Sequence, residues 1–297
     1  MLLPKWLALA VIPSATLALK STGEIPERNG VIGGVGDKSF TIKTTPAVAR
    51  TPGKLRVTEN SGICGKFFAL FKTTQNVYQA SGYGDIAANQ SIWFWYFDAR
   101  KNPANAPLVL WFNGGPGSSS MIGLLQENGP CRITNDSYID QPVGVGFSHG
   151  EEKVGTSEEA AADLWTFLQM FLADERFAHL VKNDLGIWTE SYGGHYGPVF
   201  AKYFLAQNTA IRGHTTAGVH LNMKALGIGN GITDSFTQYS EYITYAEENP
   251  YVVTLVPTDW IADAKTAWNQ TGGCKDQIIA CNNGGNDTVQ QRIQQAL

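Results

Sequence analysis

The fold prediction depends on one stretch, residues 185–194, which reads Leu185-Gly186-Ile187-Trp188-Thr189-Glu190-Ser191-Tyr192-Gly193-Gly194. Its first four residues predict a short buried strand, and Tyr196 to Leu205 continues with the spacing of a helix. A serine between a strand and a helix is the context of a nucleophile elbow, a tight turn that projects the serine hydroxyl at the helix N-terminus. Gly193 supplies the second glycine of that pattern, whereas Thr189 occupies the position of the first. A surface serine in a glycine-rich turn is the alternative.

The second informative segment is a glycine-rich loop, Asn113-Gly114-Gly115-Pro116-Gly117-Ser118-Ser119. It directly follows Pro107 to Phe112, an apolar segment that predicts a strand. Such a loop presents backbone N–H groups to an anion, and in an α/β-hydrolase it gives half of the oxyanion hole. A phosphate-binding loop is the rival interpretation, but its Gly-x-x-x-x-Gly-Lys-Ser/Thr pattern is absent from the sequence.

Strands alternate with helices along the middle of the chain. Ser91 to Phe97 predicts an aromatic strand, and Met223 to Ile228 predicts another. Between them, Thr156 and Glu159 form the capping box of a helix. The apolar positions of this helix recur at helical spacing: Ala161, Leu164, Leu168, Phe171 and Leu172. The alternation predicts an α/β fold with a mostly parallel central sheet.

Length and charge exclude several classes of protein. The chain has 297 residues, with 22 basic and 26 acidic side chains and a formal net charge of −4. It is long enough to bury a real core. No Lys/Arg-rich run occurs, which excludes an electrostatic nucleic-acid binder. With 43% apolar residues and a small net charge, wholesale disorder is excluded as well.

The N-terminal region predicts the compartment. Residues 1–18 resemble a secretory signal peptide, because a lysine precedes a short apolar run and small residues lead up to Ala18. A membrane anchor is disfavoured since Pro13 interrupts a run too short to span a bilayer, and a buried strand is the other alternative. Residues 19–54 are interpreted as a propeptide or a loosely packed lead-in. Four sequons predict glycosylation in a secreted chain: Asn89, Asn135, Asn269 and Asn286.

Four cysteines are present: Cys64, Cys131, Cys274 and Cys281. In a secreted chain this even number favours disulfide bonds, with three possible pairings. Cys274 and Cys281 are close enough in sequence to close a small loop, and free buried thiols are the alternative. No Cys-x-x-Cys pattern or spaced histidine pair occurs, so no metal site is predicted.

Four motifs occur in order along the chain: Trp111-Phe112-Asn113-Gly114-Gly115-Pro116-Gly117, Gln126-Glu127-Asn128-Gly129-Pro130, Asp140-Gln141-Pro142-Val143-Gly144-Val145-Gly146-Phe147-Ser148 and Glu190-Ser191-Tyr192-Gly193-Gly194. With these motifs the chain strongly resembles the serine carboxypeptidases, a family with the α/β-hydrolase fold. The resemblance runs from about Leu55 to the C-terminus and implies a partial domain over residues 55–297. It implies that Ser191 is the acylating nucleophile, and that the backbone N–H groups of Gly115 and Tyr192 hold the oxyanion.

The resemblance also implies a binding site for the free carboxylate of a peptide. Asn113, Glu127 and Glu190 would bind it, with Trp111 nearby. Two carboxylates facing a third repel it unless they hold protons, and crowding of like charges raises carboxyl pKa values. Peptide binding is therefore expected to weaken as pH rises. For Glu127, a solvated helix residue is the alternative, and Asp140 is expected to be a structural residue at a strand end.

The family's catalytic base and its orienting acid come from downstream motifs resembling Gly-His-x-Val/Met-Pro and Gly-Asp-x-Asp, and neither occurs before Leu297. His195, one helical turn after Ser191, is badly placed to reach its hydroxyl. The other histidines lie in no recognisable catalytic context: His149, His179, His214 and His220. The chain as given is therefore expected to be truncated and to lack activity.

Three internal differences from the family are also expected to matter. Only Thr134 to Ile139 remains before Asp140, so a central strand is expected to be missing. Residues 65–71 look like a short insertion, and Ser118 replaces the usual cysteine. These differences suggest skipped or retained gene segments, or decay of the gene.

The predicted function is that of a serine-type carboxypeptidase, which releases C-terminal residues from peptides through a serine acyl-enzyme. One alternative is a non-catalytic secreted glycoprotein that binds peptide C-termini, and another is a carboxypeptidase-like acyltransferase. The expected partners are peptides or proteins with a free C-terminus, without nucleic acid and without a membrane after signal removal. The expected location is the secretory pathway, either extracellular or vacuolar. No metal or organic cofactor is implied.

Overall fold

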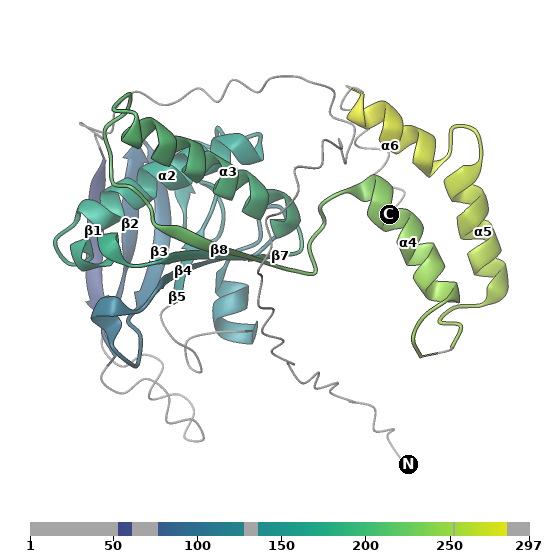
Figure 1. Cartoon of the computed structure of the whole chain (residues 1–297), viewed down its shortest axis with the longest axis horizontal. Coiled ribbons are helices and arrows are strands. Elements are labelled where there is room, and N and C mark those ends of the chain that lie inside the picture. Colours follow the sequence, from purple (N-terminus) through teal and green to yellow (C-terminus); the bar gives the residue numbers. More distant parts are fainter. Residues whose placement is uncertain (1–52, 61–76, 128–135, 252, 284–297) are drawn as a thin grey trace, which may run out of the picture.

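The computed structural model describes residues 53–60, 77–127, 136–251 and 253–283 (Figure 1). Within these residues eight strands form one sheet: β1 (Lys54–Asn60), β2 (Gln79–Ala87), β3 (Gln90–Phe97), β4 (Leu108–Phe112), β5 (Asp136–Asp140), β6 (His149–Gly150), β7 (Leu185–Glu190) and β8 (Met223–Gly229). The order is β1-β2-β3-β5-β4-β7-β8, with β6 paired to β3.

The sheet has an antiparallel part and a parallel part. β1, β2, β3 and β5 pair antiparallel in that order, and β6 pairs antiparallel with β3. β5, β4, β7 and β8 pair parallel to one another. Parallel neighbours need long crossover connections, which helices supply here. The predicted α/β fold is confirmed, and its parallel strands carry the candidate site.

Two long helices, α2 (Ser157–Ala173) and α3 (Gly193–Arg212), lie side by side on one face of the sheet (Figure 1). α2 begins with the predicted capping box: the Glu159 backbone N–H donates to Thr156 Oγ1 at 3.2 Å, and the Thr156 N–H donates to Glu159 Oε2 at 3.1 Å. These contacts satisfy two backbone donors that have no partner inside the helix. The apolar face predicted for α2 is buried against the sheet.

The core between the helices and the sheet is rich in phenylalanine. The rings of Phe171 and Phe177 stack with centroids 4.0 Å apart, and Phe94 from β3 meets Phe171 edge-on at 5.4 Å. Phe177 precedes a short 3₁₀ helix, η4 (Ala178–Lys182). Aromatic pairs of this kind add to the stability that burial of their area provides.

The presence of β5 in the sheet corrects one prediction. The expectation that a central strand is missing is wrong, because β5 lies between β3 and β4, with Tyr138 opposite both Trp95 and Trp111. Tyr138, Ile139 and Asp140 are fully buried. Five residues of strand span about 16 Å, which is enough to pair with β4, itself five residues long. The few residues that remain before Asp140 therefore suffice.

Three helices follow β8 and pack on one another: α4 (Ser235–Glu247), α5 (Thr258–Asn269) and α6 (Cys274–Asn282). They lie apart from the sheet (Figure 1). The sequence pattern does not predict them. Their signal is weak, since α4 buries no residue and α5 and α6 bury one each, Ile261 and Ile278.

The prediction that Cys274 and Cys281 close a small loop is wrong. Both lie on α6 and both are free thiols. Seven residues of α-helix rise about 10 Å, whereas a disulfide requires Cα atoms within about 7 Å. Cys64 and Cys131 lie outside the described residues.

Other predictions fall partly outside the described residues as well: the signal peptide over 1–18, nearly all of the lead-in over 19–54, the insertion over 65–71, and the sequons at Asn135 and Asn286. Asn89, in the turn between β2 and β3, and Asn269, at the end of α5, are exposed. Glycosylation at both remains a prediction. In the part of the chain that the structure describes, no helix combines the length and apolar character needed to cross a membrane.

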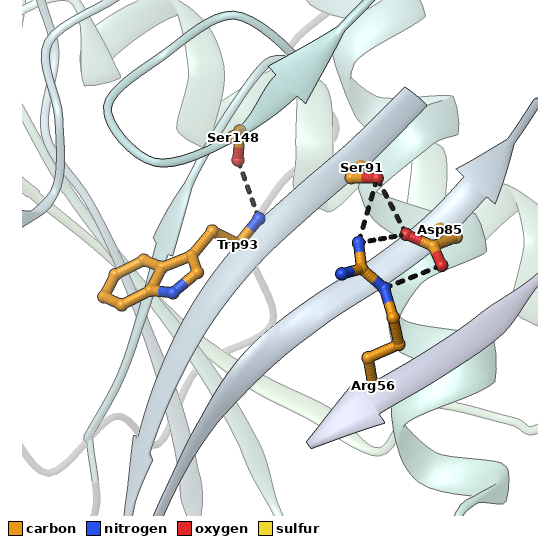
Figure 2. A network of polar contacts seen from close by, with 5 residues as sticks. All are labelled: Arg56, Asp85, Ser91, Trp93 and Ser148. Atoms are coloured by element: carbon orange, nitrogen blue, oxygen red, sulfur yellow. Dashed lines mark hydrogen bonds and ion pairs between the residues drawn. The ribbon is translucent and has the colours of Figure 1, made fainter. Parts of the chain in front are cut away.

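An ion pair and a hydrogen bond link β1, β2 and β3 at the edge of the sheet (Figure 2). Arg56 from β1 donates to both carboxylate oxygens of Asp85 on β2, at 2.9 and 2.7 Å. Ser91 Oγ from β3 donates to Asp85 Oδ1 at 2.7 Å. The Arg56 guanidinium holds the pKa of Asp85 below its usual range. Because both partners are partly exposed, the pair contributes less than about 1 kcal/mol.

Replacing Phe171 by Ala should lower the free energy of unfolding by about 3–5 kcal/mol, since it deletes a buried ring and leaves a cavity. The matched control is Leu205→Ala on α3, where the side chain is 51% exposed; its effect should stay within about 0.5 kcal/mol. Denaturant unfolding of both variants measures the difference. Equal losses in the two variants would contradict the described packing.

Candidate active site

Parallel pairing of β4 with β7 brings the two predicted motifs to one edge of the sheet. Phe112 lies opposite Thr189 in the register, so the next residues, Asn113 and Glu190, lie side by side at the carboxyl ends of the two strands. Ligand sites of open α/β sheets lie at the carboxyl ends of the strands, which is where these residues are found.

The turn between β7 and α3 has the geometry of a nucleophile elbow. Ser191 has φ 55°, a left-handed conformation that is costly for a residue other than glycine. The chain around β8 holds it: Ser191 N–H donates to Gly229 O at 3.0 Å, and Ser191 O accepts from Ile232 N–H at 2.8 Å. Ser191 is half-buried at the start of α3. The predicted strand–turn–helix is confirmed.

Thr189 explains how this elbow works without its first glycine. The Thr189 side chain is buried, and its Oγ1 donates to Gly193 O at 2.9 Å, so the hydroxyl ties the strand end to the first turn of α3. A Cβ at Gly193 would lie 2.4 Å from Thr189 Cβ. The second glycine is therefore required because the first position carries a side chain.

The glycine-rich loop packs directly on the elbow. A Cβ at Gly114 would lie 2.5 Å from the backbone nitrogen of Tyr192 and 2.7 Å from Glu190 O. Among the described residues, no acceptor takes the backbone N–H of Gly115 or of Tyr192. The two donors that the resemblance assigns to an oxyanion hole thus belong to segments in contact.

A cluster of polar side chains lies beside Ser191. The Asn113 amide Nδ2 donates to Glu190 Oε1 at 2.7 Å, with a longer contact of 3.4 Å to Glu127 Oε1. On its other side Asn113 Oδ1 accepts from Trp111 Nε1 at 2.8 Å and from Gly123 N–H at 3.1 Å. The structure therefore brings together all four residues predicted to bind a carboxylate.

The environment of Glu190 favours its protonated form. Burial raises the pKa of Glu190 above its usual value, and the facing carboxylate of Glu127 raises it further. The Asn113 amide opposes both effects by donating to the ionised form. Crowding of carboxylates was expected from sequence, and the structure adds burial as the larger cause.

Glu127 ends a short π-helical segment, η3 (Gly123–Glu127), and its side chain is exposed. Gly123 at the start of the segment lies against the Trp111 ring, where a Cβ would come within 2.3 Å of Nε1. The role of Gly123 was missed from sequence. The only signal was its position in the segment between two motifs.

All five histidines lie in the described part of the chain, and none of them hydrogen-bonds Ser191 there. His195 follows Ser191 on α3, and its ring packs on Tyr192 with centroids 4.7 Å apart. Burial lowers the pKa of His195. Within the described ranges, no group of three His, Cys, Asp or Glu side chains could hold a metal ion.

Comparison with known proteins identifies the family. A family model described as serine carboxypeptidase matches residues 70–296. Carboxypeptidase S1 of Penicillium janthinellum is 43% identical over 246 residues, which cover 76% of this chain and 55% of that protein. A vacuolar serine-type carboxypeptidase of Saccharomyces cerevisiae is 40% identical over 182 residues, covering 56% of this chain and 34% of that protein. The chain belongs to the serine carboxypeptidase family.

A solved structure agrees on the fold. The chain resembles the prohormone-processing carboxypeptidase Kex1 of Saccharomyces cerevisiae with a TM-score of 0.51 and 24% identity, covering 69% of this chain and 52% of that one. At this identity the likeness establishes the α/β-hydrolase fold alone. The chain spans about half the length of Carboxypeptidase S1 and of a carboxypeptidase S1 homologue of Arthroderma otae, two curated relatives that it matches.

Replacing Gly114 by Ala should push the glycine-rich loop away from the elbow, because the new methyl group meets backbone atoms that cannot rotate aside. Overpacking of this kind costs about 1–3 kcal/mol of unfolding free energy. Gly155→Ala is the matched control, since its Cβ would meet nothing nearer than Glu159 Oε2 at 3.7 Å. Thermal unfolding of both variants tests the contact, and a fully stable Gly114→Ala protein would refute it.

Proposed function

We propose that this protein is a serine-type carboxypeptidase that holds the free carboxylate of a peptide with Asn113, Glu127 and Glu190 and uses Ser191 as nucleophile. The observation that carries the proposal is the hydrogen bond from the Asn113 amide to Glu190, next to the left-handed Ser191. An amide N–H and a protonated carboxyl are both hydrogen-bond donors, which suits them to a carboxylate ligand. Their position beside the serine selects the last peptide bond of the substrate.

In the proposed reaction, Ser191 Oγ attacks the carbonyl carbon of that last bond. The oxyanion that forms accepts hydrogen bonds from the backbone N–H groups of Gly115 and Tyr192. Expulsion of the terminal amino acid leaves an acyl-enzyme, and water then releases the shortened peptide. Within the described residues these two N–H groups have no acceptor, and the close approach of Gly114 to the Tyr192 nitrogen places their segments in contact, which supports this assignment.

The serine also needs a base to accept its proton. No histidine hydrogen-bonds Ser191 within the described residues, and His195 packs on Tyr192 instead. We therefore propose that a polypeptide of these 297 residues binds peptide C-termini and turns them over very slowly. For a polypeptide of these 297 residues alone, this observation favours the second candidate function, that of a secreted protein that binds peptide C-termini without catalysis.

Location follows from the same proposal. Binding through a protonated Glu190 requires acid, and acid is found in vacuoles and in some extracellular media. One relative is named as vacuolar. We therefore propose a destination in the secretory pathway, either the vacuole or the outside of the cell.

The polypeptide should bind a peptide with a free C-terminus at least tenfold more tightly at about pH 4 than at about pH 7. The first pH value lies near the ordinary carboxyl pKa, and the second lies well above it. The pKa of Glu190 is raised, so its proton persists above the ordinary carboxyl range and is lost as pH rises through the raised value. The donor to the ligand carboxylate is then replaced by a like charge. Calorimetric titration at both pH values, with the C-terminally amidated peptide as control, measures the effect.

Glu190→Gln keeps a donor at every pH, so most of this pH dependence should disappear while binding in acid remains. Equal affinity of the wild type for acid and amide peptides would exclude the carboxylate site. Equal pH dependence of Glu190→Gln and the wild type would exclude Glu190 as its source.

Turnover separates the two candidate functions. Release of terminal amino acids by the 297-residue polypeptide should fall several orders of magnitude below that of an intact triad enzyme. The Ser191→Ala variant should show the same residual rate. A substantial rate that Ser191→Ala abolishes would instead establish catalysis and require a base for the serine.

A further inference from the structure

Asp140, at the end of β5, is a fully buried carboxylate that receives hydrogen bonds from two separate loops. Oδ1 accepts from Ser119 Oγ at 2.7 Å and from the Ser120 backbone N–H at 2.9 Å. Oδ2 accepts from the Phe147 backbone N–H at 2.9 Å. Burial raises the pKa of Asp140, and the three donors partly oppose that rise. Three hydrogen bonds fix the orientation of a buried carboxylate, and they also restrict the motion of the groups that donate them.

The fit around this carboxylate is close. A Cβ at Gly146 would lie 2.1 Å from Asp140 Oδ2, so only glycine allows the second loop to approach. The backbone of Asp140 is also tied: its carbonyl accepts from Ser148 Oγ at 2.6 Å, and the same oxygen of Ser148 accepts from the Trp93 N–H at 2.7 Å. Figure 2 shows the contact between Ser148 and Trp93. Asp140 therefore lies at a fixed position relative to β3.

The contacts continue from Asp140 to the candidate site. Ser120, whose N–H donates to the carboxylate, also accepts from the Asn113 backbone N–H at 3.3 Å and donates its hydroxyl hydrogen to Ile139 O at 2.8 Å. The loop from Asn113 to Ser120 is thus held at both ends. At its start Gly114 rests on the elbow, and at its finish Ser119 and Ser120 are held by Asp140.

We propose that Asp140 is a positioning residue that fixes the glycine-rich loop and thereby the Gly115 N–H and the Asn113 amide, which act on the ligand. The role of Asp140 in acting on the ligand rests on the proposed function, whereas its ordering of the loop does not. A carboxylate that served only the core would bond to strands or helices. Here all three donors come from loops, and one of those loops carries the site residues.

Hydrogen exchange of backbone amides tests the ordering directly. In Asp140→Asn, an amide NH₂ replaces one of the two carboxylate oxygens, so it faces the N–H or O–H group that donated to that oxygen. Exchange within residues 113–121 and 146–148 should become about tenfold faster or more, as expected for loss of hydrogen bonds to a charged group. The matched control is Asp85→Asn, since Asp85 also accepts from an arginine and a serine on the same sheet but contacts no site residue. The two variants are compared at conditions of equal global stability.

Faster exchange confined to the two loops in Asp140→Asn, and absent in Asp85→Asn, would support the proposal. Unchanged exchange in the loops, or the same change in both variants, would overturn it. Should Asp140→Asn not fold, Ser119→Ala removes one donor to Asp140 from a half-buried position; it also removes the acceptor of the Met121 N–H, so Met121 is left out of the comparison. A smaller increase in exchange over the same residues is then expected, and no increase would overturn the proposal.

A second measurement links the ordering to ligand recognition. The ratio of affinities for the free-acid and amidated peptides in acid should fall about tenfold in Asp140→Asn and stay constant in Asp85→Asn, because a merely destabilised protein loses both affinities together. An unchanged ratio in Asp140→Asn would overturn the positioning role. If the wild type itself shows no preference for the acid, the proposed function fails, and the exchange experiment alone decides whether Asp140 orders the loop.

Discussion

The parallel register between β4 and β7 is the constraint on which the candidate site depends. Phe112 and Thr189 are the last residues that pair between these two strands, so Asn113 and Glu190 follow side by side at the strand ends although they are 77 residues apart in sequence. A shift of the register by one residue would turn every side chain of β7 to the other face of the sheet. The burial of Leu185 and Ile187 against the helices prevents that shift. The hydrophobic core thereby fixes the position of polar groups outside it.

The site also requires close contact between the glycine-rich loop and the elbow, and the small residues of the two motifs allow this contact. Gly114 lies against the backbone of the elbow at a distance that excludes any side chain. Ser191 holds a left-handed conformation, which the bonds to Gly229 and Ile232 maintain. Strain of this kind persists only where surrounding structure determines it. The elbow is therefore a property of β7, β8 and α3 together.

Two carboxyl groups in and near the site differ in how far they are buried and in which groups face them. Glu190 is partly removed from water and faces Glu127, so the free energy of its ionised form rises. Asp140 is removed from water completely, but three donors surround it. The first carboxyl is suited to hold a proton and donate it to a ligand in a hydrogen bond. The second is suited to organise a loop.

The sequence by itself determined the local elements. The strand and helix around Ser191, the capping box at Thr156 and the loop after Phe112 rest on periodicity, caps and glycine content, which act over a few residues. The family resemblance then named Asn113, Glu127 and Glu190 as partners. Only the tertiary structure decided that β5 completes the sheet, that Thr189 replaces a glycine by bonding to Gly193, and that Asp140 joins two loops. These features depend on pairing between segments distant in sequence, and such pairing is settled by the packing of the whole sheet.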